Sequence, residues 1–347
     1  MLSRRGFCSA LAAGPAWARS RRATFPGKRW DVREPRELGL DAAALDRLAE
    51  RLSGRGCVVR DGYVVRQWGS QSEVGDWLSS AKPVLSTLLF FAIAEGKVKG
   101  PDTLIREFGW PLKPKDQTMT FRHLANMTSG YARPEAPGAA WAYNDYAIQL
   151  YQKTLFDRVF REDPEAVAMD RRRLGFLELE DGLGFRATNR RMSASVRDFA
   201  RIAWFWLQQG RWRKTQLLPR RLFEWYQRPH VPAGLPHTEK APTDDYLEIG
   251  TYGGGSDHFT EFGPGIYGFN WWFNATGRLH PGRRTWPDAP RDAFMSIGAG
   301  GNCAVMMPGL NMVLAAARAN WGKVEPGNAE CPASQYMKLM VEAAGGR

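Results

Sequence analysis

The stretch from Ser79 to Glu95 limits what this chain can fold into more than any other part of it. Its central run, Leu85 to Ala94, is apolar on nearly every side of a helix, and Gly96 follows where helices commonly end. A helix without a polar face has to be covered by other parts of the protein. The sequence therefore predicts a buried central helix over residues 79–95.

Strand patterns occur toward both ends of the chain, and helical patterns lie between them. Asp61-Gly62 separates two apolar strands and supplies the positive φ angles that a tight hairpin turn requires. Strands are predicted at 57–60, 63–68, 267–273, 294–297, 304–307 and 312–317. Further helices are predicted at 41–53, 120–126, 146–160, 196–209 and 333–344. We therefore expect an α/β fold of the α+β sandwich type.

In this fold, one antiparallel sheet is built from the N- and C-terminal segments and flanked by helices, with a mostly helical lobe inserted in its middle. We expect residues 1–22 to be an export signal and disordered lead, and residues 23–347 to form a single domain. The α/β lobe of that domain comprises residues 36–97 and 240–347, and its helical lobe comprises residues 98–239.

The first residues have the pattern of a twin-arginine export signal. Arg4-Arg5 precede a short, mildly apolar segment that ends in Ala16-Trp17-Ala18, a small-residue cleavage site. The alternative is a disordered basic tail on a cytoplasmic protein. No other stretch approaches the ~18 uninterrupted apolar residues that a membrane span needs. We expect an exported protein, periplasmic or extracellular, without a membrane span.

The charge distribution and the cysteines indicate which kinds of partner, metal site and disulfide this chain can have. The formal net charge is +12, but apart from Arg171-Arg172-Arg173 and the N-terminus the arginines are scattered, so we expect no nucleic-acid partner. Removal of the signal would leave Cys57, Cys303 and Cys331, an odd number without metal-ligand spacing. We expect no metal and no cofactor, and at most one disulfide. The sequence does not specify an oligomeric state.

The start of the buried helix carries a serine and a lysine one turn apart. Pro83 is tolerated only near a helix start, so Ser79 lies where backbone N–H groups lack partners and the helix dipole is positive. Lys82, three residues on, lies on the same face and can reach the Ser79 hydroxyl. A buried lysine beside a serine is one way to activate a weak nucleophile.

Several landmarks occur in the same order as in a known family, over roughly residues 35–345. The hairpin at 58–68 precedes Ser79-Ser80-Ala81-Lys82, and then come Thr120-Phe121-Arg122-His123-Leu124 with Thr128-Ser129-Gly130, followed by Tyr143-Asn144-Asp145. As an ordered set they resemble the serine beta-lactamase and penicillin-binding protein superfamily, specifically its class C-like branch of esterases, D-aminopeptidases and carboxypeptidases. The resemblance implies the beta-lactamase/transpeptidase-like form of the fold predicted above.

The resemblance implies roles for three side chains. Ser79 would be the acylated nucleophile, Lys82 its activating partner, and Tyr143 the proton shuttle of the family's Tyr-x-Asn element. Asp145 stands where that element has asparagine. A carboxylate there favours the ammonium form of Lys82 and shifts base catalysis toward Tyr143. The alternatives are that Tyr143 is a packed loop aromatic and that Asp145 caps the helix that follows.

The family's third element, Lys-Thr-Gly or His-x-Gly on a sheet edge, has no direct counterpart. Ile297-Gly298-Ala299-Gly300-Gly301-Asn302 occupies its place. Gly298, Gly300 and Gly301 would let substrate approach the strand, and a backbone N–H near Gly301 could be an oxyanion donor; otherwise these glycines form a bend or bulge. His280-Pro281-Gly282 fits the pattern literally, but Pro281 argues against a strand there.

These features predict a serine hydrolase of a small-molecule ester, amide or peptide-like substrate. Loss of the third element's cation argues for neutral esters or amides. The alternatives are a beta-lactamase or D-alanyl-D-alanine carboxypeptidase, and a catalytically impaired binding protein of the same fold. Elsewhere, we expect His123 to have a structural role, and Trp271 and Trp272 to pack on opposite faces of a sheet.

Overall fold

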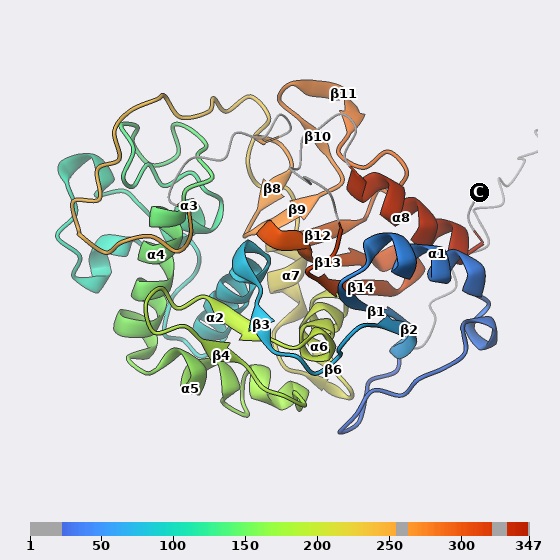
Figure 1. Cartoon of the computed structure of the whole chain (residues 1–347). Coiled ribbons are helices and arrows are strands. Elements are labelled where there is room, and N and C mark those ends of the chain that lie inside the picture. Colours follow the sequence, from blue (N-terminus) through green and yellow to red (C-terminus); the bar gives the residue numbers. More distant parts are fainter. Residues whose placement is uncertain (1–22, 255–262, 321–331, 346–347) are drawn as a thin grey trace, which may run out of the picture.

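A single antiparallel sheet organises the protein. The computed structural model describes residues 23–254, 263–320 and 332–345. Within these residues the sheet has seven strands in the order β2-β1-β14-β13-β12-β9-β8 (Figure 1). They are β1 (Arg55–Arg60), β2 (Tyr63–Trp68), β8 (Tyr267–Gly268), β9 (Trp271–Phe273), β12 (Phe294–Gly298), β13 (Asn302–Met307) and β14 (Met312–Ala317). The predicted sheet, built from both ends of the chain, is confirmed.

The sheet contains two tight hairpin turns, one that the local sequence predicted and one that it did not. Asp61 and Gly62 have φ angles of 54° and 92°, so the predicted hairpin between β1 and β2 is confirmed. The single strand predicted at 267–273 is wrong, because Phe269 and Asn270 have φ angles of 46° and 70° and turn the chain back. The segment is therefore a second hairpin, β8–β9.

Three smaller sheets lie outside the main one in the described part of the chain. Their strands are β3 (Gly75–Asp76), β4 (Gly184–Phe185) and β5 (Met192–Ala194), then β6 (Arg211–Trp212) with β7 (Thr215–Gln216), and β10 (Thr276–Gly277) with β11 (His280–Arg284). In the first of them, β5 pairs with both β3 and β4. Asp76, in the strand that leads to Ser79, therefore pairs with Ser193 of β5, more than a hundred residues later in the chain.

Helices cover both faces of the sheet. The α-helices are α1 (Ala42–Leu52), α2 (Lys82–Ala94), α3 (Phe121–Ala125), α4 (Asp145–Lys153), α5 (Pro164–Met169), α6 (Val196–Leu207), α7 (Arg220–Tyr226) and α8 (Pro332–Ala343). A π-helical segment, Thr154–Phe160, continues α4. The 3-10 helices are Pro35–Leu38, Leu78–Ala81, Ile105–Phe108, Pro114–Asp116, Leu174–Leu177, Ala299–Gly301 and Pro308–Leu310. Figure 1 shows the sheet between the α1–α8 pair and α6.

The predicted central helix is α2, and it is buried from Lys82 to Ala92. The Phe90 ring lies 5.5 Å from Phe223 of α7 and 6.2 Å from Trp271 of β9. Its buried polar groups are satisfied, since the Trp206 indole of α6 donates to the Thr87 hydroxyl at 2.8 Å. The prediction is confirmed, because elements from three separate parts of the chain cover this helix.

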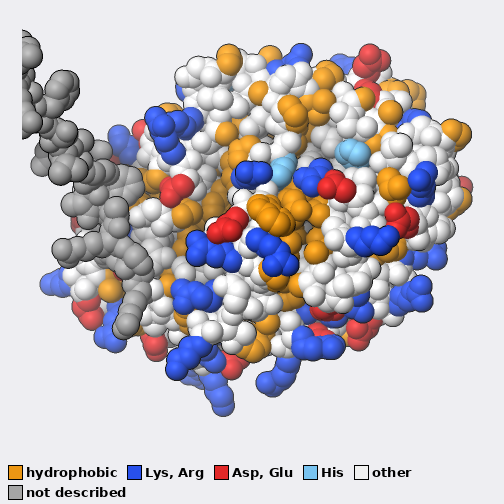
Figure 2. All heavy atoms as spheres, turned by 180° about the vertical axis from the view of Figure 1, so that it is seen from behind, with side chains coloured by type: hydrophobic (Ala, Val, Ile, Leu, Met, Phe, Trp, Pro, Cys, Tyr) orange, Lys and Arg blue, Asp and Glu red, His pale blue; other side chains and the backbone are white. Residues whose placement is uncertain are grey.

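The surface carries charges of both signs. On the face shown in Figure 2, Lys and Arg side chains are interspersed with acidic ones, and hydrophobic side chains gather near the centre. Trp225 of α7 is one of the large apolar side chains that reach solvent, with 52% of it exposed. No helix among the described residues is long and apolar enough to cross a membrane.

Candidate active site

The predicted nucleophile lies at a tight turn between β3 and α2. The chain leaves β3 at Asp76, forms the 3-10 helix Leu78–Ala81 and enters α2 at Lys82, with Pro83 in its first turn. The α-helix therefore begins three residues later than predicted, and the Lys82 N–H bonds the Ser79 carbonyl to close the turn. Ser79 is partly exposed, whereas Ser80 and Lys82 are buried.

Lys82 is a buried cation with two oxygen partners. Its Nζ donates to the Tyr143 hydroxyl at 2.8 Å and to Asp145 Oδ1 at 2.6 Å. The Lys82 side chain is 0% exposed and that of Asp145 3%. Taking both charges out of water is costly, and the charge-assisted hydrogen bonds offset that cost. Removing the charge of Lys82 or that of Asp145 would leave the other charge buried without its counter-ion.

Tyr143 joins the lysine to the serine. Burial raises the pKa of its phenol, as does the Asp145 carboxylate, while a hydrogen bond with Ser79 acts in the opposite direction. The phenol is therefore protonated at neutral pH and lies between the hydroxyl and the amine. The structure thus brings together the three side chains that the sequence indicated.

Asp145 is the counter-ion of Lys82 and does not cap α4. The cap is Asn144, whose Oδ1 accepts the N–H groups of Tyr146 and Ala147 at 2.9 and 3.4 Å. The alternative that Asp145 caps this helix is therefore wrong. Asparagine in the preceding position takes the free N–H groups, which leaves the carboxylate available to Lys82.

An aromatic wall holds the Tyr143 ring. Trp272 of β9 stacks on it at 5.6 Å, and Tyr267 of β8 meets its edge at 6.0 Å. Trp271, one residue earlier, points to the other face and packs on Trp206 at 5.6 Å. The prediction that the two tryptophans pack on opposite faces is confirmed, and Trp272 supports the site.

The three glycines predicted to flank the site lie in different surroundings. A Cβ on Gly298 would come within 2.7 Å of Ser80 N and 3.1 Å of Ser79 N, so this strand end lies directly against the turn that carries Ser79. Gly300 has only the end of Leu78 near it. Gly301 lies against the Ala319 backbone and shapes the turn into β13. The Ser80 and Ser296 hydroxyls, 2.8 Å apart, hold β12 to that turn.

Two histidines have other roles. His280 is the first residue of β11, so the prediction that Pro281 would prevent a strand there is wrong. Among the described strands β11 pairs only with β10, so its other edge is unpaired and tolerates a proline. His123 Nδ1 lies 3.2 Å from the Thr120 hydroxyl in the capping box of α3. Its predicted structural role is confirmed.

Two residues that no sequence motif indicated also reach the site. The Tyr252 hydroxyl donates to the Leu78 carbonyl at 3.0 Å, immediately before Ser79. The Gly253 backbone lies against the Asp145 carboxylate. Both belong to a loop that is distant in sequence from Ser79, so only the folded chain shows their proximity.

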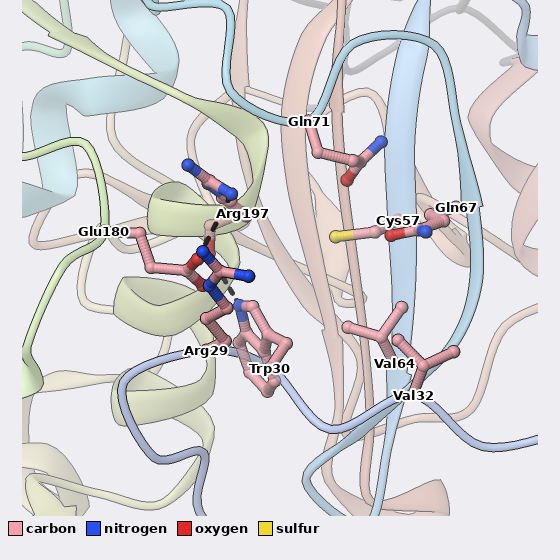
Figure 3. A pocket seen from close by; sticks show the side chains of 9 residues that line it. All are labelled: Arg29, Trp30, Val32, Cys57, Val64, Gln67, Gln71, Glu180 and Arg197. Carbon is pink, nitrogen blue, oxygen red and sulfur yellow. Dashed lines mark hydrogen bonds and ion pairs between the residues drawn. The ribbon is translucent and has the colours of Figure 1, made fainter.

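A separate cavity of about 140 Å³ lies between the N-terminal segment and β1. Figure 3 shows Trp30 and the Glu180–Arg197 pair on one side and Cys57 with Val64 on the other. Burial raises the pKa of the Cys57 thiol to about 12, which makes it a poor nucleophile. The structure shows no disulfide between Cys57 and Cys303, and Cys331 lies outside the described residues. No group of three His, Cys, Asp or Glu in the described ranges could hold a metal ion.

Known structures with this fold include several hydrolases. No protein-family model and no curated protein matches the chain. A 6-aminohexanoate-dimer hydrolase from Bacillus anthracis matches with a TM-score of 0.60 and 16% identity, over 93% of this chain and 88% of that one. A beta-lactamase from Mycobacterium bovis gives 0.57 and 18%, over 87% and 99%. EstCE1, a hydrolase with promiscuous acyltransferase activity, gives 0.59 and 13%, over 88% and 98%. Identities this low establish a common fold.

Proposed function

Because the chain has the fold of serine beta-lactamases and penicillin-binding protein homologues, we propose that it is a serine hydrolase that acts through an acyl-enzyme on Ser79. The observation that carries the proposal is the continuous contact of Ser79, Tyr143 and Lys82. A partly exposed hydroxyl beside a tyrosine whose phenolate form a buried ammonium can stabilise is an arrangement suited to removing the serine proton.

Acylation would proceed in two stages. With Tyr143 as the phenolate, stabilised by the Lys82 ammonium, the Ser79 oxygen attacks the substrate carbonyl carbon while its proton passes to Tyr143. The tetrahedral intermediate then expels the alcohol or amine, which takes the proton back from Tyr143. Water repeats the sequence on the acyl-enzyme, giving the carboxylic acid and free Ser79.

The developing oxyanion needs N–H donors beside Ser79. The Ser79 N–H lies at the start of the helical segment, where it benefits from the positive end of the dipole. The second donor would come from the turn that begins at Gly298, since this glycine brings β12 against the nucleophile. We assign Gly300 and Gly301 the role of shaping that turn.

The proposed substrate is a neutral ester or amide. The strand β12, Phe294–Gly298, contains no lysine, arginine or histidine with which to hold a substrate carboxylate. Lys82, the cation beside the serine, is already paired with Asp145. Recognition of a penicillin or a D-alanyl peptide would require a cation at the third element, so a neutral acyl compound fits better.

Active-site labelling tests the nucleophile. A fluorophosphonate probe should label the wild type with one equivalent and leave the Ser79→Ala variant unlabelled. Equal labelling of both proteins would show that Ser79 is not the nucleophile. A short nitrophenyl ester should be hydrolysed faster than a chromogenic cephalosporin. The opposite order would favour the beta-lactamase alternative, and no turnover of either with an unlabelled Ser79 would favour the binding protein.

We also propose that the protein is exported, on the basis of Arg4-Arg5 in the N-terminal segment, which lies outside the described residues. Fusing residues 1–22 to a reporter should direct it out of the cytoplasm. Changing both arginines to lysine should retain the reporter inside. Export of the lysine variant at the wild-type level would contradict the twin-arginine assignment.

A further inference from the structure

The residue before the nucleophile has an unfavourable backbone conformation. Leu78 has a φ of 51°, in the left-handed region that a leucine rarely adopts. Such a conformation persists only when neighbouring groups hold it in place. Because Ser79 follows directly, whatever fixes the two peptide groups of Leu78 also aims the serine hydroxyl.

Two side chains from separate segments hold Leu78. Its N–H donates to Asp76 Oδ1 at 2.8 Å, and its carbonyl accepts the Tyr252 hydroxyl at 3.0 Å. Asp76 is itself held by Arg191, whose Nε donates to it at 2.8 Å. Both peptide groups of the unfavourable residue are therefore bonded, one from β3 and one from the distant loop.

Tyr252 contacts the lysine side of the site as well. Its backbone N–H donates to the Asp145 carbonyl at 3.1 Å, and its own carbonyl accepts Asn189 Nδ2 at 3.0 Å. The ring centroid lies 5.4 Å from Lys82 Nζ. Burial raises the pKa of Tyr252 well above its ordinary value, so the phenol keeps the proton that it donates to Leu78.

Gly253 completes this contact through its lack of a side chain. A Cβ at this position would overlap Asp145 Oδ2, while Lys82 donates to the other carboxylate oxygen, Oδ1. The backbone of the loop therefore closes over the carboxylate and restricts its movement away from Lys82.

We propose that Tyr252 and Gly253 are positioning residues for acylation: Tyr252 fixes the turn that aims Ser79, and Gly253 leaves room for Asp145 to stay on Lys82. This inference rests on the proposed function and identifies two residues that hold Ser79 and Asp145 in position for it. A loop that served packing alone would not need its phenol on Leu78 or a glycine on Asp145.

The first test compares two conservative variants in one loop. Tyr252→Phe removes only the hydroxyl, and Tyr246→Phe does the same where the hydroxyl donates to Asp116 at 2.7 Å, away from Ser79. The measurements are the second-order rate of fluorophosphonate labelling, its stoichiometry and the thermal midpoint. We expect Tyr252→Phe to slow labelling about tenfold at full stoichiometry, and Tyr246→Phe to leave the rate within about twofold of wild type.

The outcomes separate the two proposals. If Ser79→Ala abolishes labelling and Tyr252→Phe labels at the wild-type rate, the positioning role is wrong and the proposed function stands. If Ser79→Ala labels as well as wild type, the proposed function itself fails. Equal slowing by Tyr252→Phe and Tyr246→Phe would assign the effect to loop packing and overturn the inference.

The second test concerns Gly253 and has a different readout. Gly253→Ala should push the Asp145 carboxylate off Lys82, and therefore move the pH dependence of labelling in the same direction as Asp145→Asn. Gly282→Ala is the matched control, because nothing lies within 4 Å of the Cβ position there. A Gly253→Ala profile that coincides with the wild type would overturn the inference even if Tyr252→Phe does not fold.

Discussion

Replacing Asp145 with asparagine removes the buried negative charge beside Lys82 and Tyr143 while keeping the shape of the side chain. Burial and then the Asp145 carboxylate raise the pKa of Tyr143. The reactive form in the proposed mechanism is the Tyr143 phenolate, so wild-type activity should rise with pH toward that high pKa. Without the carboxylate the phenol loses its proton more readily, and the rise should occur at lower pH.

The size of this displacement follows from the geometry. The two hydrogen bonds of Lys82, laid end to end, place Asp145 Oδ1 no more than about 5.4 Å from the Tyr143 oxygen. At that separation, with an effective dielectric constant of about 20, two unit charges interact by about 3 kcal/mol, which corresponds to about 2 pH units. We therefore expect the ascending limb of Asp145→Asn to lie about 2 pH units below that of the wild type.

The assay is kcat/KM for a nitrophenyl ester, or the labelling rate, measured across the pH range in which the protein stays folded. Asp116→Asn is the matched control, since Asp116 is also buried and contacts a lysine and a tyrosine, Lys115 and Tyr246, each at 2.7 Å. Its profile should coincide with the wild type. A limb that stays in place or moves to higher pH in Asp145→Asn would refute the proposed role of Tyr143.

Three further changes have clear expected results. Tyr143→Phe should lower kcat/KM by about 10²- to 10⁴-fold through loss of the proton shuttle. Its thermal midpoint in calorimetry should stay close to wild type, because the ring still stacks on Trp272. Activity above about a tenth of wild type would contradict the role of Tyr143. Gly298→Ala should force β12 away from Ser80 N and lower the labelling rate at least tenfold, whereas Gly282→Ala should not change it. Lys82→Met should lower the free energy of unfolding in urea by about 3 kcal/mol, because it leaves the buried Asp145 carboxylate without its counter-ion. Combining Lys82→Met with Asp145→Asn should recover most of that loss. Equal destabilisation of single and double variants would show that the pair is not coupled.

The sequence predicted the elements whose signals are local. The absence of a polar face determined α2, and Asp61-Gly62 determined the β1–β2 turn, because both depend on residues adjacent in the chain. The β8–β9 turn was missed for the same reason. Phe269 gives no signal of a positive φ, and tertiary contacts such as its N–H bond to Asn126 Oδ1 at 2.8 Å hold it there.

The site shows the same division. Ser79 and Lys82 are one turn apart, so their proximity could be predicted from spacing alone. Whether Asp145 caps α4 or pairs with Lys82 depends on where the Lys82 ammonium lies. The two residues are 63 positions apart, so the packing of the folded chain decides this and the local sequence does not. Tyr252 could not be predicted, since its partner at Leu78 is 174 residues away and a loop tyrosine is unremarkable in sequence.

The helix that starts beside Ser79 is also among the most deeply enclosed elements of the molecule. A replacement between Lys82 and Ala92, the buried part of α2, disturbs the packing around the helix and the turn that carries Ser79 together, so a change there acts on stability and on the proposed activity at once. Directed evolution for new acyl groups should therefore spare this helix and randomise the solvent-facing loops, whose residues can vary without loosening the interior.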